Sequence, residues 1–378
     1  MKKQLVRACI FAAFPTLALA QAQGSGSAIT IYGDLDAYIG HIRSDSGAHI
    51  TGLNDGSILR SRFGLRGSEL LAPGYEAKFN LELGFNSDTG TLADPGRLFD
   101  RQAWVGFNTP YGEVRFGRQN TEIFLIGGAI DYTDRTTFGS IINTFGVPSR
   151  YDNDISYRTP RWAGVQVSAH ATLPENSGNV DNHSLYQLAV DWQGGPYRAG
   201  YAGLQARPND VTATVGKRIN YHNAYANYKY SKGTLYLAFV RSNNSTANAN
   251  GLNGATILNN VSIPNNYFPG TDLNATRYYN IWQVSADYRF NPQLRVGALV
   301  GEIHDTTDRN SGAWGGNIGA FYDLSKRTTL YGFANYMKNQ SNAGFRFSGS
   351  AAPSANLVGI DINGHDLTGL QVGILHKF

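Results

Sequence analysis

The sequence predicts an all-β fold, a sixteen-stranded antiparallel transmembrane β-barrel, and three observations lead to this prediction. The composition includes 44 Gly, 22 Tyr and 19 Phe in 378 residues, which favours strands and turns over helices. After the N-terminal segment no run of 18 apolar residues occurs, so the pattern excludes membrane-spanning helices but not membrane-spanning strands. The third observation is an alternation of polar and apolar residues along most of the chain.

The first twenty residues have the three parts of a secretory signal peptide. Lys2, Lys3 and Arg7 are followed by an apolar stretch over 8–19 and a small-x-small site at Ala18-Leu19-Ala20. An N-terminal membrane anchor is the alternative, but the apolar stretch is shorter than the roughly 20 residues that a helical span needs. We therefore predict a signal peptide over 1–20 and a single barrel domain over 21–378.

Charge and cysteine content exclude several functional classes. Residues 1–20 contain Cys9, the only cysteine, so the mature chain is expected to have no disulfide and no thiolate metal site. They also contain three of the 32 basic residues and none of the 28 acidic ones, which leaves 29 against 28 and argues against a nucleic-acid partner. Hydrolase, zinc-protease and phosphate-loop motifs are absent, so we predict no catalytic residues, no metal and no cofactor.

Strict alternation first appears in residues 29–40, where Ile29, Ile31 and Leu35 share one face and Thr30 and Tyr32 the other. Segments of this kind have about the ten residues that a tilted membrane strand needs. We predict sixteen of them in order: 29–40, 58–67, 75–86, 98–108, 112–118, 150–158, 163–172, 184–193, 196–206, 219–230, 234–242, 277–290, 293–304, 312–323, 328–338 and 367–378.

The connections between these segments alternate in length. Short turn signals such as 109–112 and 193–196 join even strands to odd ones, and longer polar stretches such as 243–276 and 339–366 join odd strands to even ones. This asymmetry is typical of outer-membrane barrels. A soluble propeller or a pair of sandwiches is the alternative, but no blade repeat of roughly 40–50 residues is present. A packed core would also bury the charged or titratable inward residues at a large cost; these are Glu76, Lys78, Glu82, Arg115, Arg158 and His170.

The segment 119–149 lacks the alternation found on either side of it. It contains apolar runs over 123–130 and 138–147, separated by an acidic patch with Asp131 and Asp134. A loop of this length in a compact domain usually has a function. We predict that it folds into the barrel and narrows a pore.

Several motifs in this order resemble the Gram-negative porins of the neisserial and burkholderial type, over nearly the whole mature chain. They are the sequences at 31–37 (IYGDLDA), 61–69 (SRFGLRGSE), 99–107 (FDRQAWVGF), 112–119 (GEVRFGRQ), 323–328 (DLSKRT) and 376–378 (HKF). The resemblance implies a homotrimer of sixteen-stranded barrels whose third extracellular loop bends into the lumen. It also implies that Phe378 is a recognition signal for the barrel-insertion machinery, and that Arg62, Arg101 and Arg150 are pore arginines.

The alternation along the strands places several arginines on the same face, which supports a row of positive charge at the constriction. Arg60, Arg62 and Arg66 share one face, and Arg150 shares a face with Arg158. Because arginine stays charged at any working pH, such a row would make a permanent positive wall, with Asp131 and Asp134 facing it. Strict alternation would turn Arg101 outward, so it needs a bulge or a strand end to reach the lumen. The alternative is that some arginines only neutralise lumen carboxylates.

We therefore expect an outer-membrane porin: a passive diffusion channel for small hydrophilic solutes and ions, with a weak preference for anions. Beyond the homotrimer, the expected partners are outer-membrane lipid, lipopolysaccharide and the barrel-insertion machinery. An outer-membrane hydrolase and an adhesin or anchor barrel are the alternatives. A barrel enzyme can assemble its site from distant strands without a motif, whereas an adhesin would need a plugged lumen and exceptional loops.

Overall fold

The computed structural model describes residues 28–133, 136, 138–173, 185–206, 219–243, 278–308, 310–347 and 356–378. The predicted signal peptide over 1–20, Asp134 and nearly all of the predicted loop 243–276 lie outside the described residues. The elements are β1 Ala28–Ser44, β2 His49–Asp55, β3 Arg62–Ala72, β4 Tyr75–Gly84, β5 Gln102–Thr109, β6 Gly112–Asn120, α1 Glu122–Leu125, α2 Gly127–Ile130, α3 Ile141–Phe145, β7 Arg150–Arg158, β8 Val165–Thr172, β9 Leu185–Gly194, β10 Tyr197–Ala206, β11 Ile219–Tyr230, β12 Gly233–Ser242, β13 Tyr279–Arg289, β14 Leu294–Asp305, β15 Ala313–Asp323, β16 Thr328–Asn339, the 3₁₀-helix η2 Gly359–Asp361 and β17 Asp366–Lys377.

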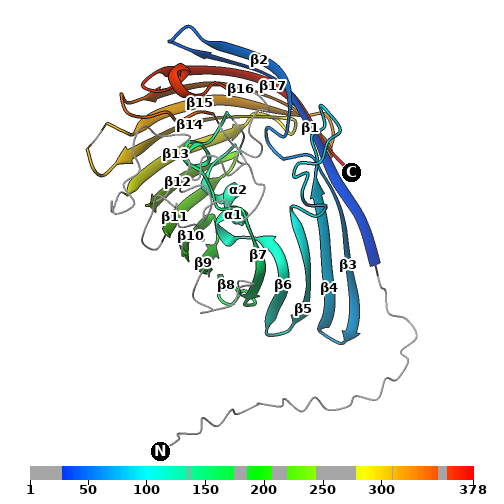
Figure 1. The fold of residues 1–378 in the computed structure, drawn as a ribbon. Coiled ribbons are helices and arrows are strands. Elements are labelled where there is room, and N and C mark those ends of the chain that lie inside the picture. Colours follow the sequence, from blue (N-terminus) through cyan, green and yellow to red (C-terminus); the bar gives the residue numbers. More distant parts are fainter. Residues whose placement is uncertain are drawn as a thin grey trace, which may run out of the picture.

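The strands form one antiparallel sheet that closes into a barrel (Figure 1). From β3 onward each strand pairs with the next along the chain, β2 and β3 both pair with β1, and β1 also pairs with β17, where Asp34 lies opposite Lys377. The carbonyl and amide groups of Phe378 also bond to the backbone of Gly33. The first and last strands therefore meet at the seam, and the described strands close on themselves without a free edge.

The predicted number of strands is confirmed, although one strand is interrupted. The two pieces β2 and β3 pair with the same edge of β1, with a shift of register between them. The intervening residues leave the sheet because the Asp36 carboxylate accepts the backbone N–H groups of Ile58 (2.7 Å) and Leu59 (2.8 Å). The predicted strand 58–67 therefore starts too early, and the sequence pattern missed β2.

The alternation places apolar residues on the outer face and polar ones inside. Ile29, Ile318 and Val372 are 72%, 69% and 62% exposed, although all three are large and apolar. The opposite residues of the same strands face the interior, as Asp34 and Asp36 do on β1. Such an outer surface is costly in water and suits a lipid environment. Among the described residues, no helix is both long and apolar enough to cross a membrane.

The loop between β6 and β7 packs against the inner wall, with α1 and α2 lying within the ring of strands (Figure 1). It runs over 121–149, since Gln119 and Asn120 still belong to β6, and both predicted apolar runs form short helices. Three of its side chains contact glycines of the wall: Tyr132 meets Gly297 and Gly319, Ile141 meets Gly301 and Gly315, and Phe138 meets Gly40 and Gly369. The missing side chains of these glycines leave the space that the loop fills.

Polar bonds hold the same loop in place. The Tyr132 hydroxyl donates to Asn317 on β15, whose amide donates to the Gly139 carbonyl. Arg295 on β14 donates to the Tyr132 carbonyl at 2.8 Å. The buried apolar cluster thus lies between the loop and the inner wall of the barrel, rather than between two sheets.

Candidate functional site

Three arginines that are far apart in sequence gather around one carboxylate, Glu82 near the end of β4. Arg101 donates from Nε to the Glu82 Oε1 at 2.6 Å, and Glu82 also interacts electrostatically with Arg62 and Arg150. The antiparallel pairing explains the gathering, because β3 and β5 flank β4 and bring Arg62 and Arg101 to the same level. We call Asp34, Arg62, Glu82, Arg101 and Arg150 the arginine cluster.

Two neighbouring groups complete this cluster. The Arg62 Nε lies 3.0 Å from the Asp34 Oδ2, and the Tyr32 hydroxyl donates to the Glu82 Oε2 at 2.8 Å. Three permanent positive charges therefore share two carboxylates. Asp100, which precedes Arg101, also acts electrostatically on Arg101 and Arg150 from outside the cluster.

The arginines differ in how they meet the interior space. The side chain of Arg62 is 17% exposed, whereas Arg101 and Arg150 are only 2% and 0% exposed. The Arg150 guanidinium lies 4.7 Å from the centre of the Phe124 ring, so helix α1 of the inward loop covers it. A solute can therefore touch Arg62 directly, while the other two arginines act through their charge.

Arg101 reaches the inside because it stands at a strand end. Strand β5 begins at Gln102, so the alternation that would turn Arg101 outward does not include it. Its backbone N–H bonds to the Glu82 carbonyl at 3.2 Å. The carboxylate of the preceding Asp100 accepts the Gly84 N–H at 2.6 Å, which fixes this turn against β4.

The expectation that Asp131 faces the arginines is wrong. Its carboxylate accepts bonds from the Thr133 N–H (2.8 Å) and hydroxyl (2.7 Å), and from the Gln283 amide on β13 (2.9 Å). The Asp131 side chain is buried, because it accepts hydrogen bonds from the turn of its own loop and from the barrel wall beneath that loop. Asp134, the second predicted acid, lies outside the described residues.

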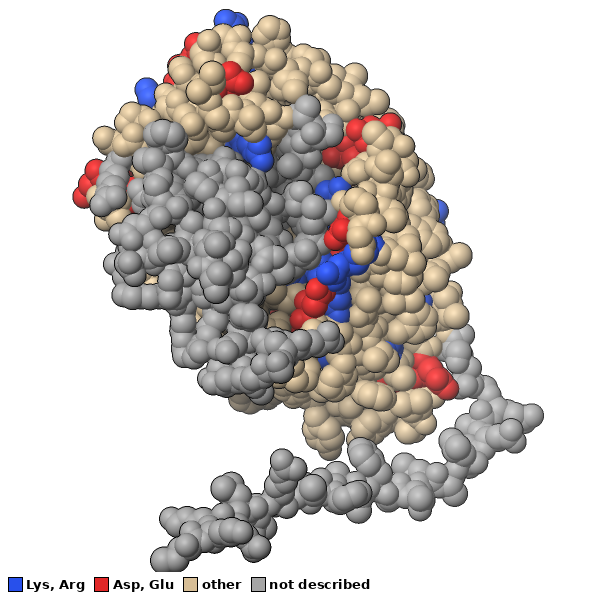
Figure 2. All heavy atoms as spheres, viewed as in Figure 1, with Lys and Arg blue, Asp and Glu red and all other residues tan. Residues whose placement is uncertain are grey.

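Most of the remaining predicted lumen residues pair with a side chain of opposite charge, and Arg60 and Arg66 have uncharged neighbours. Lys78 lies between Glu76 (3.5 Å) and Glu113 (3.9 Å), and Arg115 pairs with Glu113 at 2.7 Å. Arg60 bonds to Asn86 in the segment before β3, Arg66 lies over the Tyr32 ring, and Arg158 pairs with Glu122. Figure 2 shows charged side chains of both signs gathered in the hollow of the barrel, beside an outer surface that is almost uncharged.

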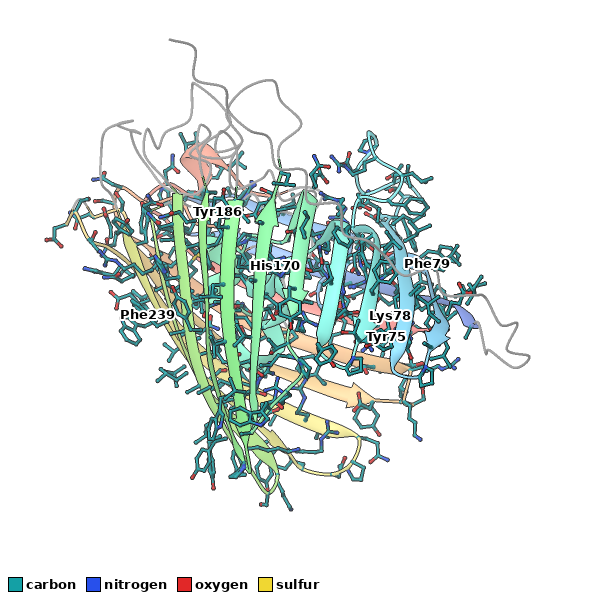
Figure 3. The ribbon with its side chains drawn as sticks, turned by 90° about the horizontal axis from the view of Figure 1, so that it is seen from below. Tyr75, Lys78, Phe79, His170, Tyr186 and Phe239 are labelled. Atoms are coloured by element: carbon teal, nitrogen blue, oxygen red, sulfur yellow. The ribbon has the colours of Figure 1, made fainter. Side chains whose placement is uncertain are left out.

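A latch that the sequence reasoning missed ties the inward loop to the wall. Glu122, at the start of α1, accepts from Arg158 on β7 and from His170 on β8, and His170 also bonds to Asp154. Figure 3 labels His170 on its strand. The Thr121 hydroxyl caps α1 by accepting the Phe124 N–H at 2.9 Å. The Thr-Glu pair before an apolar run is the only sequence signal that could have indicated this anchor.

The latch changes the chemistry of its carboxylate. Burial alone would raise the pKa of Glu122, but the hydrogen bond to His170 and the positive charge of Arg158 outweigh it and lower the pKa to about 2. Glu122 is therefore ionised at any pH near neutrality. Among the described residues, no group of three or more His, Cys, Asp or Glu side chains could hold a metal ion.

The last residue occupies a distinct place. The Phe378 ring covers Gly33 on the outer face and is 44% exposed, and a Cβ at Gly33 would collide with it. The absence of a side chain at Gly33 thus lets the terminal ring lie flat across the seam.

The family model described as Gram-negative porin matches residues 8–342. An outer membrane porin protein of Bordetella pertussis is 28% identical, over 95% of this chain and 99% of that one. The outer membrane porin protein 32 of Delftia acidovorans is 27% identical over the full length of both chains. The major outer membrane protein P.IB of Neisseria gonorrhoeae is 24% identical over 91% of this chain and 95% of that protein.

Solved structures show the same fold. The anion-selective porin from Comamonas acidovorans has a TM-score of 0.71 and 22% identity, with 93% of this chain and all of that chain covered. The trimer form of OmpT from Vibrio cholerae has a TM-score of 0.63 and 14% identity, covering 93% and 99% of the two chains.

Proposed function

The chain belongs to the Gram-negative porin family, and we propose that its passive outer-membrane channel carries small hydrophilic solutes with a weak preference for anions. The family and the named relatives point to a channel rather than to a hydrolase. The observation that carries the anion preference is the arginine cluster, in which Arg62, Arg101 and Arg150 gather around Glu82, with Asp34 beside Arg62.

The proposed constriction consists of the arginine cluster on one side and the inward loop on the other. Screening limits the reach of a charge to about 8–10 Å at physiological salt, so only charges at the narrowest level should select between ions. Arg62 would act by direct contact, and Arg150 by holding Phe124 and by its field. The similar porin of Comamonas acidovorans is named as anion-selective, which supports the same sign.

A homotrimer is the proposed assembly. The outer face has apolar hollows over β1, β2 and β14–β17, and small residues are part of their lining, namely Ala37, Ala320, Gly332 and Ala334. Small residues let neighbouring walls approach closely. Gly33, another small residue of β1, is covered by Phe378 and is not available for this contact. The trimer form of the Vibrio structure agrees with this assembly.

Three further parts of the proposal concern export and insertion. Residues 1–20 would act as the signal peptide. The exposed ring of Phe378 would be recognised by the barrel-insertion machinery. The apolar outer face would contact outer-membrane lipid, with lipopolysaccharide as the lipid of the outer leaflet.

Recording from the purified protein in a planar bilayer tests both the channel activity and the sign of its ion selectivity. We expect stepwise conductance and a zero-current potential across a salt gradient that reports anion preference, which should weaken as salt rises. A wild-type channel that favours cations at low salt would contradict the proposed role of the arginine cluster. It would instead indicate that Glu76, Glu82 and Glu113 dominate.

A further inference from the structure

A second charged space lies on the other side of the inward loop, toward the short turns after β7 and β9. It is a cavity of about 200 Å³ between α1 and the ends of β7–β11. Its charged lining comes from Glu122 on α1, Arg161 in the turn after β7, and the strand residues Arg158, Asp191 and Arg198; Gln166, Ser168, Tyr201 and Tyr225 add further polar groups. We call this cavity the lower chamber.

The lower chamber holds three guanidinium groups and two carboxylates. Asp191 accepts from Arg161 (2.5 Å), from Arg198 (2.6 Å) and from the Tyr225 hydroxyl (2.5 Å). Glu122 accepts from Arg158. One positive charge is therefore left over inside a small, partly enclosed space.

The three arginines of the lower chamber differ in how many of their N–H groups are hydrogen-bonded within the protein. Arg161 also donates to the Gly164 and Asp191 carbonyls, so it serves the turn. Arg158 and Arg198 each place one nitrogen on a carboxylate, and Arg198 also lies 5.7 Å from the centre of the Tyr225 ring. Their side chains are 28% and 32% exposed, unlike the buried Arg101 and Arg150.

We infer that the lower chamber is a binding site for a small solute carboxylate, held between Arg158 and Arg198 with Gln166 and Ser168 as further polar contacts. This inference rests on the proposed channel function, which brings such solutes to the site. The planar fork of arginine matches a carboxylate, and Asp191 already shows a carboxylate held by this kind of donor set. The small volume restricts the site to compact solutes.

The lower chamber is separate from the arginine cluster. Arg150 and Arg158 stand at opposite ends of β7, eight residues apart, which corresponds to about 26 Å along a strand. Their side chains contact different residues of α1, since Arg150 lies against the Phe124 ring and Arg158 pairs with Glu122, so the two sites are distinguished by their own contacts. An anion that passes the arginine cluster would meet a second, weaker binding site before it leaves the channel.

Block of single channels by succinate tests the inference. With potassium succinate added to a chloride-based recording, the wild-type channel should show transient block, and uncharged succinamide should show none. Arg198→Gln should weaken the block about tenfold, the size expected for one charge-assisted hydrogen bond. Arg198→Lys keeps the charge but loses the fork, so it should restore only part of the block.

Two variants serve as matched controls. Arg66→Gln removes the same charge from an exposed inward arginine on β3, and it should leave the succinate block within about twofold of wild type. Arg62→Gln alters the arginine cluster and should change ion selectivity without weakening the block.

Each contrary result has its own meaning. Conductance steps without succinate block would overturn the inference and leave the channel function intact, whereas absence of steps would overturn the channel function itself. Equal weakening by Arg198→Gln and Arg66→Gln would show a general charge effect instead of a site. Full block in Arg198→Lys, or tighter block by inorganic phosphate than by succinate, would overturn the assignment to carboxylates.

Discussion

At the scale of single residues, Glu82 decides how much of the positive charge in the arginine cluster reaches a passing ion. One oxygen of its carboxylate forms an ion pair with Arg101, and the other accepts a hydrogen bond from the Tyr32 hydroxyl. The carboxylate also interacts electrostatically with Arg62 and Arg150. Removing a positive or a negative member should therefore move selectivity in opposite directions.

Glu82→Gln should increase anion preference, and Arg62→Gln should shift the channel toward cations. Zero-current potentials at low salt measure both effects. Glu82→Gln should also destabilise the protein by about 3–5 kcal/mol, because Arg101 would remain buried without its carboxylate. If the two substitutions shift the potential in the same direction, the charges of this cluster do not control selectivity.

Glu122 leads to a prediction about pH. Its pKa is lowered to about 2, so its stabilising effect is complete above the ordinary carboxyl pKa of about 4.5 and is lost as pH falls toward 2. We expect the inward loop to stay anchored at pH 4 and to loosen near pH 2, seen as increased current noise in single channels.

Glu122→Gln provides the control for this titration, since it has no carboxylate to protonate. Its noise should already be raised at neutral pH and should change little on acidification. Wild-type noise that rises fully between pH 6 and 4 would contradict the anchoring role of Glu122.

At the scale of elements, the inward loop depends on glycines of the barrel wall. A Cβ at Gly297 would meet the Tyr132 ring. We expect Gly297→Val to displace the loop from β14 and β15 and to raise single-channel conductance, because the valine side chain would fill the space that the Tyr132 ring occupies. Loss of this buried ring contact is worth about 3–5 kcal/mol of loop docking.

The double variant Gly297→Val with Tyr132→Ala distinguishes displacement of the loop from damage to the strand. It should move back toward Tyr132→Ala alone, since the clash with the ring would no longer exist and only the contact with the Ala286 carbonyl oxygen (2.7 Å) would remain. A double-mutant cycle in conductance measures this coupling. Ala298→Val, at the neighbouring outward position of the same strand, should leave conductance unchanged. Additive effects of the two substitutions would show that Tyr132 does not seat on Gly297.

At the scale of the whole molecule, assembly depends on the outer face, which the fold of one barrel leaves exposed. A Cβ at Gly332 would make only ordinary contacts, the nearest at 3.4 Å, so a larger outward side chain does not disturb the monomer. Gly332→Phe should fill the apolar hollow and release monomers in mild detergent, as measured by native mass or unheated gel migration.

Leu188→Phe on β9 enlarges another outward residue, 52% exposed, and should leave the trimer intact. A Gly332→Phe protein that remains fully trimeric would place the subunit contact elsewhere on the barrel. A wild-type protein that is monomeric under the same conditions would contradict the trimer itself.

The sequence by itself determined the barrel and most of its strands. Period-two alternation is local, so each strand defines its own inward and outward faces, and the predicted strands over 150–158 and 219–230 coincide with β7 and β11. The same alternation placed Arg62, Glu82 and Arg158 on the inner side. It also singled out the segment between β6 and β7, because that segment lacks the pattern.

Only the tertiary structure decided which inward residues meet and where the exceptions point. Glu82 gathers arginines from three separate parts of the chain, and Asp131 turns to Gln283 on a strand more than a hundred residues away. Arg101 turns inward because β5 starts one residue after it, and β2 separates from β3 because Asp36 binds the intervening backbone. These outcomes depend on pairing between distant strands and on how buried polar groups find partners, and a local pattern contains neither.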